Sequence, residues 1–235
     1  SLVPKGARVV DVGTDHGYVP VWLVKHQAAA TVIATDIKPG PLEKAVMSAR
    51  RAGVEDRIKF LLCDGLSDCP PEEADTVIIA GMGGETIINI LREAPWTRCG
   101  GRRLILQPMT KPELLRQWLS DNGYSILGER LVKDAGVIYA IIVASEGRQT
   151  PLTEAELYTG GWELICDDPL FEEYLELLAS KTARAIEGLR QSRKGEDAPR
   201  LEKLKAASAG FEIMRKRLMA KKKGRGIHGD GKDDT

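Results

Sequence analysis

The sequence predicts an α/β protein with a mostly parallel sheet, followed by a smaller helical region. In roughly the first 145 residues, five short apolar runs alternate with helix-like segments, which is typical of parallel strands covered on both faces. After residue 146 the strand-like runs stop and two long amphipathic patterns begin. The 235 residues are enough for one large domain and an appendage, but too few for three ordinary domains.

The predicted parallel strands are short runs rich in Val, Ile and Leu. They cover residues 8–12, 31–36, 58–62, 76–80 and 103–106. Helices are expected at 18–27, 41–52, 85–92 and 112–121, where apolar residues recur at helical spacing. Two further strands, 124–132 and 137–145, flank a tight Asp-Ala-Gly turn and predict an antiparallel hairpin at one edge. The complete sheet therefore has seven strands.

The second region predicts an antiparallel pair of helices. Residues 147–151 form a linker, Gly160 and Gly161 interrupt the next segment, and helical patterns cover 170–194 and 199–223. Apolar positions with heptad-like spacing indicate a short coiled-coil hairpin; they are Leu175, Leu178, Ala185 and Leu189, then Leu201, Leu204, Ser208, Phe211, Arg215 and Leu218. We expect domains at 1–150 and 151–224, and a disordered tail at 225–235.

Composition excludes several classes of protein. With 43% hydrophobic and 29% charged residues the chain is globular. No run approaches the roughly 20 apolar residues that span a bilayer, so a transmembrane protein is excluded. The four cysteines form no CxxC pair, and no secretory signal pattern opens the chain, which begins with Ser1. We therefore expect no metal site and no disulfide framework, and a cytoplasmic monomer.

The net charge of zero hides an asymmetry along the chain. Residues 1–180 carry 18 basic and 26 acidic side chains, whereas residues 181–235 carry 16 basic and 8 acidic ones. A basic end on an acidic body indicates a polyanionic partner, although a solubilising tail would have the same composition. The charge pattern leaves both interpretations open.

The loop at residues 11–17, Asp-Val-Gly-Thr-Asp-His-Gly, follows the first strand and opens the first helix. Its glycines allow the backbone to pass close to a ligand at the carboxyl edge of the sheet. A dinucleotide-binding loop would have glycine where Asp15 stands, and a carboxylate there would repel a pyrophosphate. A cationic ligand, such as the sulfonium of S-adenosylmethionine, is favoured over a nicotinamide dinucleotide.

Two more carboxylates end the second and third strands. Asp36 is placed to accept hydrogen bonds from ribose hydroxyls. Its alternative role is capping the next helix, which we expect to begin too late, at Pro41. Asp64 can accept the exocyclic amine of an adenine, or it can simply form an Asp-Gly turn. Acidic residues at three successive strand ends are stronger evidence for a ligand site than any one of them alone.

These motifs together resemble one known family. The segments 11–18 (DVGTDHGY), 36–42 (DIKPGPL), 64–66 (DGL), 80–84 (AGMGG) and 106–108 (LQP) are similar to the bacterial TrmK family. Its members are class I S-adenosylmethionine-dependent methyltransferases, with a Rossmann-like fold, that methylate N1 of adenine 22 in tRNA. The resemblance covers essentially the whole chain. It implies S-adenosylmethionine as cofactor, S-adenosylhomocysteine as product, and tRNA as partner.

The positions of residues at this edge of the sheet indicate their roles. We expect Asp15, His16 and Gln107 to contact the target base; the alternatives are that Asp15 binds the methionine end, that His16 caps a helix, and that Gln107 satisfies loop backbone. The expected cofactor-binding residues are Asp11, Gly13, Asp15, Gly17, Asp36, Ile37, Asp64, Gly65, Ala80, Gly81 and Met82. The AGMGG segment lacks the Asn/Asp-Pro-Pro-aromatic motif of many adenine N6-methyltransferases, which favours N1 chemistry.

Basic residues on the helical hairpin are the expected tRNA contacts. They are Lys181, Arg184, Arg190, Arg193, Lys194, Arg215, Lys216 and Arg217. The alternative is an ordinary solvated helical face. Three other functions stay open: methylation of another substrate such as rRNA or a small molecule, RNA binding without catalysis, and nicotinamide-dependent redox chemistry, which Asp15 disfavours.

Overall fold

The computed structural model describes residues 2–191 and 198–226. The chain divides into two compact units. The first contains residues up to 129 together with 139–150, and the second contains residues 130–138 together with everything after 150. The tip of the predicted edge hairpin thus groups with the helical unit, although we expected it in the first domain.

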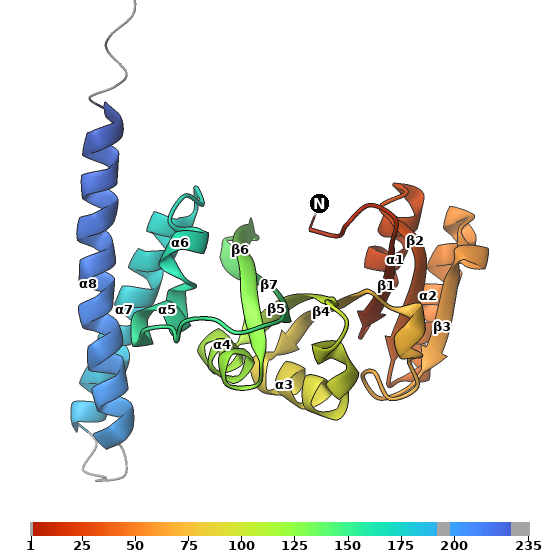
Figure 1. Ribbon diagram of the computed structural model, residues 1–235, viewed down its shortest axis with the longest axis horizontal. Helices are drawn as coiled ribbons and strands as arrows, with labels where there is room; N and C mark the ends of the chain where they lie inside the picture. Colours follow the sequence, from red (N-terminus) through yellow and green to blue (C-terminus); the bar gives the residue numbers. More distant parts are fainter. Residues whose placement is uncertain (1, 192–197, 227–235) are drawn as a thin grey trace, which may run out of the picture. The chain divides into compact units, whose positions relative to one another are not determined.

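A seven-stranded sheet, in the order β3-β2-β1-β4-β5-β7-β6, forms the first unit except for the hairpin tip at residues 130–138 (Figure 1). Strands β1 to β5 are parallel to their neighbours, and β7 is antiparallel to β5. The strands are β1 (Ala7–Val12), β2 (Ala29–Asp36), β3 (Ile58–Leu62), β4 (Thr76–Gly83), β5 (Arg103–Thr110), β6 (Tyr124–Asp134) and β7 (Val137–Glu146). The predicted fold class is confirmed, and β4 extends into the AGMGG segment with an irregular register to β5.

Two pairs of helices cover the sheet of the first unit. Helices α1 (Tyr18–Lys25) and α2 (Pro39–Ala52) pack against β2 and β3, whereas α3 (Gly84–Glu93) and α4 (Pro112–Asp121) pack against β4 and β5 (Figure 1). Helix α2 begins two residues earlier than predicted, since Pro39 has the fixed φ that suits a first turn. Short 3₁₀ turns occur at η1 (Glu55–Arg57), η2 (Pro71–Glu73) and η3 (Pro95–Arg98).

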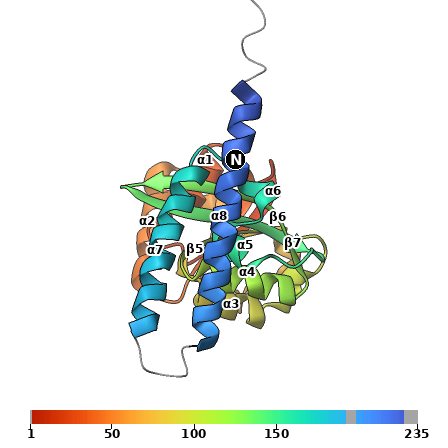
Figure 2. The ribbon, with the colours of Figure 1, turned by 90° about the vertical axis from the view of Figure 1, so that its left-hand side faces the viewer.

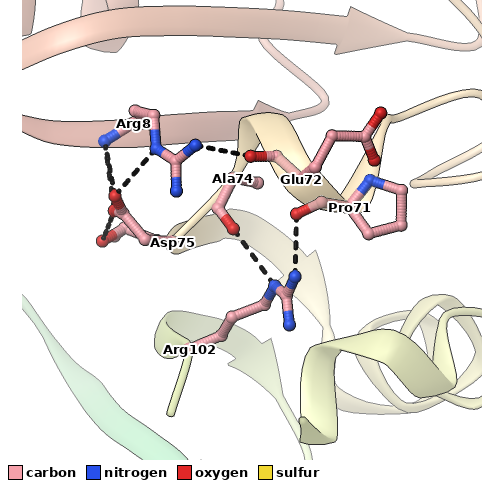
Figure 3. Close-up of polar contacts among 7 residues, drawn as sticks. Arg8, Pro71, Glu72, Ala74, Asp75 and Arg102 are labelled. Atoms are coloured by element: carbon pink, nitrogen blue, oxygen red, sulfur yellow. Dashed lines mark hydrogen bonds and ion pairs between the residues drawn. The ribbon is translucent and has the colours of Figure 1, made fainter. Parts of the chain in front are cut away.

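An arginine network holds the loop between β3 and β4 at the amino edge of the sheet (Figure 3). Arg8 donates from its backbone and side chain to the Asp75 carboxylate, at 3.1–3.3 Å, and from its guanidinium to the Glu72 carbonyl. Arg102 donates to the Ala74 carbonyl at 3.1 Å. Structural contacts therefore hold this amino edge, and the strand-end carboxylates lie at the opposite, carboxyl edge.

The second unit consists mainly of helices. They are α5 (Glu154–Thr159), α6 (Trp162–Ile165), α7 (Phe171–Gln191) and α8 (Ala198–Gly226). We did not predict α5 and α6; a capping box between Thr153 and Glu156 begins α5. Helix α8 continues to Gly226, so the predicted tail starts too early, and residues 227–235 of that tail lie outside the described part of the chain.

Helices α7 and α8 lie side by side and run antiparallel (Figure 2). Of the predicted α7 positions, Leu175 is buried and the other three are half-buried, with Thr182 and Ile186 buried between them. None of the described helices is both long and apolar enough to cross a membrane.

The buried line on α8 differs in part from the predicted one. It consists of Leu204, Ala207, Phe211, Met214 and Leu218, with the same 3-4 spacing. The predicted positions Ser208 and Arg215 are half-buried, and the fully buried stripe passes through their neighbours Ala207 and Met214 instead.

A buried ion pair connects α4 to β6. Arg116 Nε donates to Glu129 Oε1 at 2.7 Å, and both side chains are fully buried. Two charges removed from water depend on each other, because loss of one deprives the other of this ion pair.

We expect Glu129→Ala to lower the free energy of unfolding by about 3–5 kcal/mol, since it leaves the Arg116 charge buried without its carboxylate. Urea denaturation of the full chain measures this change. The matched control is Glu73→Ala, which removes the half-exposed partner of Lys59 and should cost less than about 1 kcal/mol. Equal losses from the two variants would contradict the prediction.

Candidate functional site

A cavity of about 620 Å³ opens at the carboxyl ends of β1, β2, β3 and β4. It lies where the strand order reverses between β1 and β4, which is where open α/β sheets bind ligands. The structure brings together nine of the eleven residues expected to bind the cofactor; they are Gly13, Asp15, Asp36, Ile37, Asp64, Gly65, Ala80, Gly81 and Met82. Asp11 and Gly17 are not part of the lining.

The turn after β1 requires glycine at position 13. The N–H groups of Gly13 and Thr14 both donate to the Thr35 carbonyl, at 2.8 and 2.9 Å, which fixes the turn against the end of β2. Gly13 has a φ of +71°, and a Cβ there would collide with Met82 Cε. The backbone itself therefore forms this wall of the cavity.

Gly17 has a structural role at the start of α1. It has a φ of +71°, and a Cβ would lie 2.9 Å from the backbone of Ala45 on α2. Its lack of a side chain allows α1 and α2 to pack closely, so Gly17 shapes the site without lining it.

Asp36 lines the cavity and also organises the loops around it. Its Oδ1 accepts the N–H of Lys38 at 2.9 Å, and its Oδ2 accepts the N–H of Asp15 at 3.4 Å. Lys38 is the N-cap of α2, and no side chain caps that helix start, so Asp36 does not have the alternative role of N-cap, as expected. A carboxylate has about four acceptor sites, so the two backbone contacts leave Asp36 able to accept further hydrogen bonds.

Asp64 and Gly65 form a turn that is anchored to the end of β2. The Gly65 carbonyl accepts a hydrogen bond from Thr35 Oγ1 at 3.0 Å, and the Asp64 carbonyl accepts the N–H of Ser67 at 3.0 Å. Gly65 has a φ of +56°, and a Cβ would meet Ile90 at 3.1 Å. The turn places Asp64 on the cavity wall.

Asp15 and His16 leave the β1 turn toward solvent. Asp15 lines the cavity in a left-handed conformation (φ +44°) that aspartate tolerates better than most residues. His16 Nε2 lies 3.8 Å from Asp15 Oδ1, and the His16 ring stacks on Tyr18. His16 is not part of the lining.

Gln107 supports the β4 backbone. Its Oε1 accepts the N–H of Gly81 at 2.8 Å and its Nε2 donates to Met109 Sδ at 3.5 Å. The structure thus gives Gln107 the alternative role, which is to satisfy loop backbone beside the cavity.

The sequence reasoning missed one face of α3. Thr86, Asn89, Ile90 and Glu93 line the cavity together with Thr35, Lys38 and Pro41. The 3-4-7 spacing places these α3 residues on one helical face directly after the glycine segment, but it does not indicate that this face is the one that lines the cavity.

The hairpin cations fall into two groups. Arg215 donates to Glu176 at 2.8–2.9 Å and to Glu212 at 2.9 Å, and Arg217 lies over the Trp162 ring at 5.1 Å. Among the predicted tRNA contacts, Lys181, Arg184, Arg190 and Lys216 are exposed, as is Arg217. Arg193 and Lys194 lie outside the described residues.

Asp11 is a buried carboxyl behind the β1 turn. Burial raises the pKa of Asp11 from its ordinary value of 3.8 to about 7, and a hydrogen bond with Thr14 acts in the opposite direction. Protonated Asp11 therefore contributes stability that is complete below pH 3.8 and is lost as pH rises through about 7.

Asp11→Asn mimics the protonated carboxyl. The difference in unfolding free energy between this variant and the wild type should shift in favour of the variant as pH rises from about 4 to 8. Urea denaturation across this range measures it, with exposed Asp68→Asn as control. A difference that does not change with pH for Asp11→Asn would contradict the assignment.

Comparisons with known proteins agree with this geometry. The family model described as a methyltransferase domain matches residues 1–142. The tRNA (adenine(22)-N(1))-methyltransferase of Bacillus subtilis is 35% identical over 145 residues, which are 62% of this chain and 61% of that enzyme. The chain thus spans less than two thirds of the length of this relative.

Solved structures cover more of the chain. The B. subtilis m1A22 tRNA methyltransferase TrmK is 27% identical with a TM-score of 0.79, over 90% of this chain and 93% of that one. A Streptococcus pneumoniae protein solved with S-adenosyl-L-methionine is 31% identical with a TM-score of 0.73, over 88% and 94%. The resemblance of the sequence motifs is confirmed. The chain belongs to the methyltransferase-domain family and, within it, to the TrmK family.

Proposed function

We propose that this protein transfers a methyl group from S-adenosylmethionine to N1 of an adenine in tRNA, at position 22. The cavity at the strand-order reversal, with Asp15, Asp36 and Asp64 on its wall, is the observation that supports this proposal. The similarity to the B. subtilis tRNA (adenine(22)-N(1))-methyltransferase supports the proposed substrate and position. We further propose that it acts as a monomer, and in the cytoplasm, in keeping with its four free cysteines.

The residues of the cavity fit S-adenosylmethionine. Asp36 is placed to accept the ribose hydroxyls and Asp64 to accept the adenine amine. Gly13 has no side chain, so the methionine end can approach its backbone once the flexible Met82 side chain, whose Cε lies in front of Gly13, moves aside. Asp15 provides negative charge on the cavity wall, which favours binding of a cationic sulfonium. When bound, this cofactor supplies an electrophilic methyl group.

The chemistry at N1 makes few demands on the protein. Adenine N1 has a free lone pair and no proton, so this chain needs no strong base to create the nucleophile. The methylated ring becomes cationic, and the exposed Asp15 carboxylate is placed to stabilise that charge. Gln107 acts through Gly81, because its hydrogen bond holds the β4 backbone that forms the floor. The remaining contribution is alignment of N1 with the methyl group.

Helices α7 and α8 provide the proposed phosphate contacts. Lys181, Arg184, Arg190 and Lys216 are exposed, and we assign the contact to them. Arg215 is a weaker candidate than the sequence indicated, since Glu176 and Glu212 already neutralise it.

The decisive experiment incubates unmodified tRNA transcripts with isotope-labelled S-adenosylmethionine and analyses the nucleosides by mass spectrometry. Labelled 1-methyladenosine is expected, and a transcript with guanosine at position 22 should remain unlabelled. If rRNA becomes labelled and tRNA does not, the assignment of tRNA as the substrate is wrong.

Asp36→Ala should weaken cofactor binding at least about tenfold and leave tRNA affinity unchanged, because the carboxylate that accepts the ribose hydroxyls is removed. Calorimetry with S-adenosylmethionine and with tRNA measures both affinities. Cofactor binding that Asp36→Ala does not alter would overturn the ribose role.

We expect the combined change of Lys181, Arg184 and Lys216 to Glu to lower tRNA affinity at least about tenfold without altering cofactor affinity. The slope of log K against log salt should fall by about 0.7–0.9 for each phosphate that is no longer neutralised. A control with the same change in charge converts Lys5, Lys44 and Arg51, which are exposed on the first unit, to Glu. Equal losses in both triple variants would mean that only net charge matters and that the hairpin has no specific role.

A further inference from the structure

Helix α1 presents large aromatic side chains to solvent. Tyr18 is 72% exposed and Trp22 is 50% exposed, whereas Pro20, Leu23 and Val24 of the same helix are buried. Tyr18 and Trp22 are four residues apart, so they lie on one face. Tryptophan is highly buried on average, and an exposed apolar patch of this kind usually marks an interaction surface.

Each of these rings is paired with a histidine in parallel orientation. His16 and Tyr18 have ring centroids 5.4 Å apart with planes inclined by 20°, and Trp22 and His26 have centroids 4.4 Å apart with planes inclined by 22°. His26 Nδ1 lies 2.9 Å from the Trp22 carbonyl, which fixes its ring. We call these four residues the aromatic stripe; residues 18 to 26 extend for about 12 Å along the helix.

The segment that carries the aromatic stripe contains no acidic side chain. No Asp or Glu occurs between residues 16 and 27. Lys25 lies between Trp22 and His26 in the sequence and is exposed. The stripe also begins at His16, which follows Asp15 of the cavity lining in the sequence.

We propose that the aromatic stripe is the docking surface for unpaired tRNA bases that neighbour the target adenine. This inference rests on the proposed function. N1 lies on the pairing edge of adenine, so the target must leave its stack and its neighbours lose a stacking partner. Flat exposed rings in a segment without carboxylates replace that stacking and tolerate the nearby phosphates. A purely aliphatic partner would not need flat aromatic rings for stacking.

The test compares Tyr18→Leu and Trp22→Leu with Tyr18→Phe and Trp22→Phe in the full chain. Each Leu variant should weaken tRNA binding about tenfold and raise the KM for tRNA by a similar factor, within the range for loss of one base–aromatic stack. The Phe variants should stay within about threefold of the wild type, and the Kd for S-adenosylmethionine should be unchanged in all four. Leu127→Ala, at a 51% exposed apolar residue on β6, is the matched control.

The outcomes separate this inference from the proposed function. If the wild type binds and methylates tRNA and the Leu variants behave like it, the aromatic stripe is not a stacking surface. If the wild type binds tRNA without methylating it, the proposed function fails and the binding series still decides the role of the stripe. A wild type that does not bind tRNA overturns both. A wild-type dimer that Trp22→Leu dissociates without loss of tRNA affinity, measured by sedimentation, would assign the stripe to self-association and overturn the proposal.

Discussion

The site depends on how tightly the chain turns after β1. The Gly13 and Thr14 amides are bonded to the Thr35 carbonyl, and the space in front of Gly13 is occupied by Met82 from β4. One backbone turn thus connects the ends of three neighbouring strands. It places Asp15 on the cavity wall and, through Gly17, sets the start of α1 close to α2. The cofactor cradle and the outward face of α1 are consequences of the same constraint.

Much of the fold could be predicted because buried parallel strands appear in a sequence as short apolar runs. The errors occur where local pattern is insufficient. Helices α5 and α6 have six and four residues, too few to show a helical period. On α8, two adjacent lines of residues have the same 3-4 spacing, and burial decides between them only in the folded protein. Ala207 and Met214 lie on the buried line, whereas Ser208 and Arg215 lie beside it.

The site was predictable to the extent that strand ends define it. Asp15, Asp36 and Asp64 follow three strands whose carboxyl ends meet at one edge, so sequence position alone implies their proximity. The contribution of α3 depends on the phase of a helix relative to the sheet, which sequence does not give. The role of Gln107 depends on a single hydrogen bond to Gly81, and that of Arg215 on two acidic neighbours. Side-chain partnerships of this kind become visible only in the folded chain.

The grouping of residues 130–138 with the helical unit has a consequence for modularity. Leu131 donates its N–H to Asp168 at 2.9 Å, and Lys133 pairs with Glu173 at 2.6 Å, so this hairpin tip belongs to the packing of the helices. A helical unit transplanted from residue 151 onward would lose both partners. In the chain, residues 139–150 of the other unit separate the hairpin tip from the helices. Recombination between related genes would therefore preserve the helical unit only if the hairpin tip and the helices were inherited together. The helical unit is therefore not a separate carboxyl-terminal segment that could be exchanged by itself.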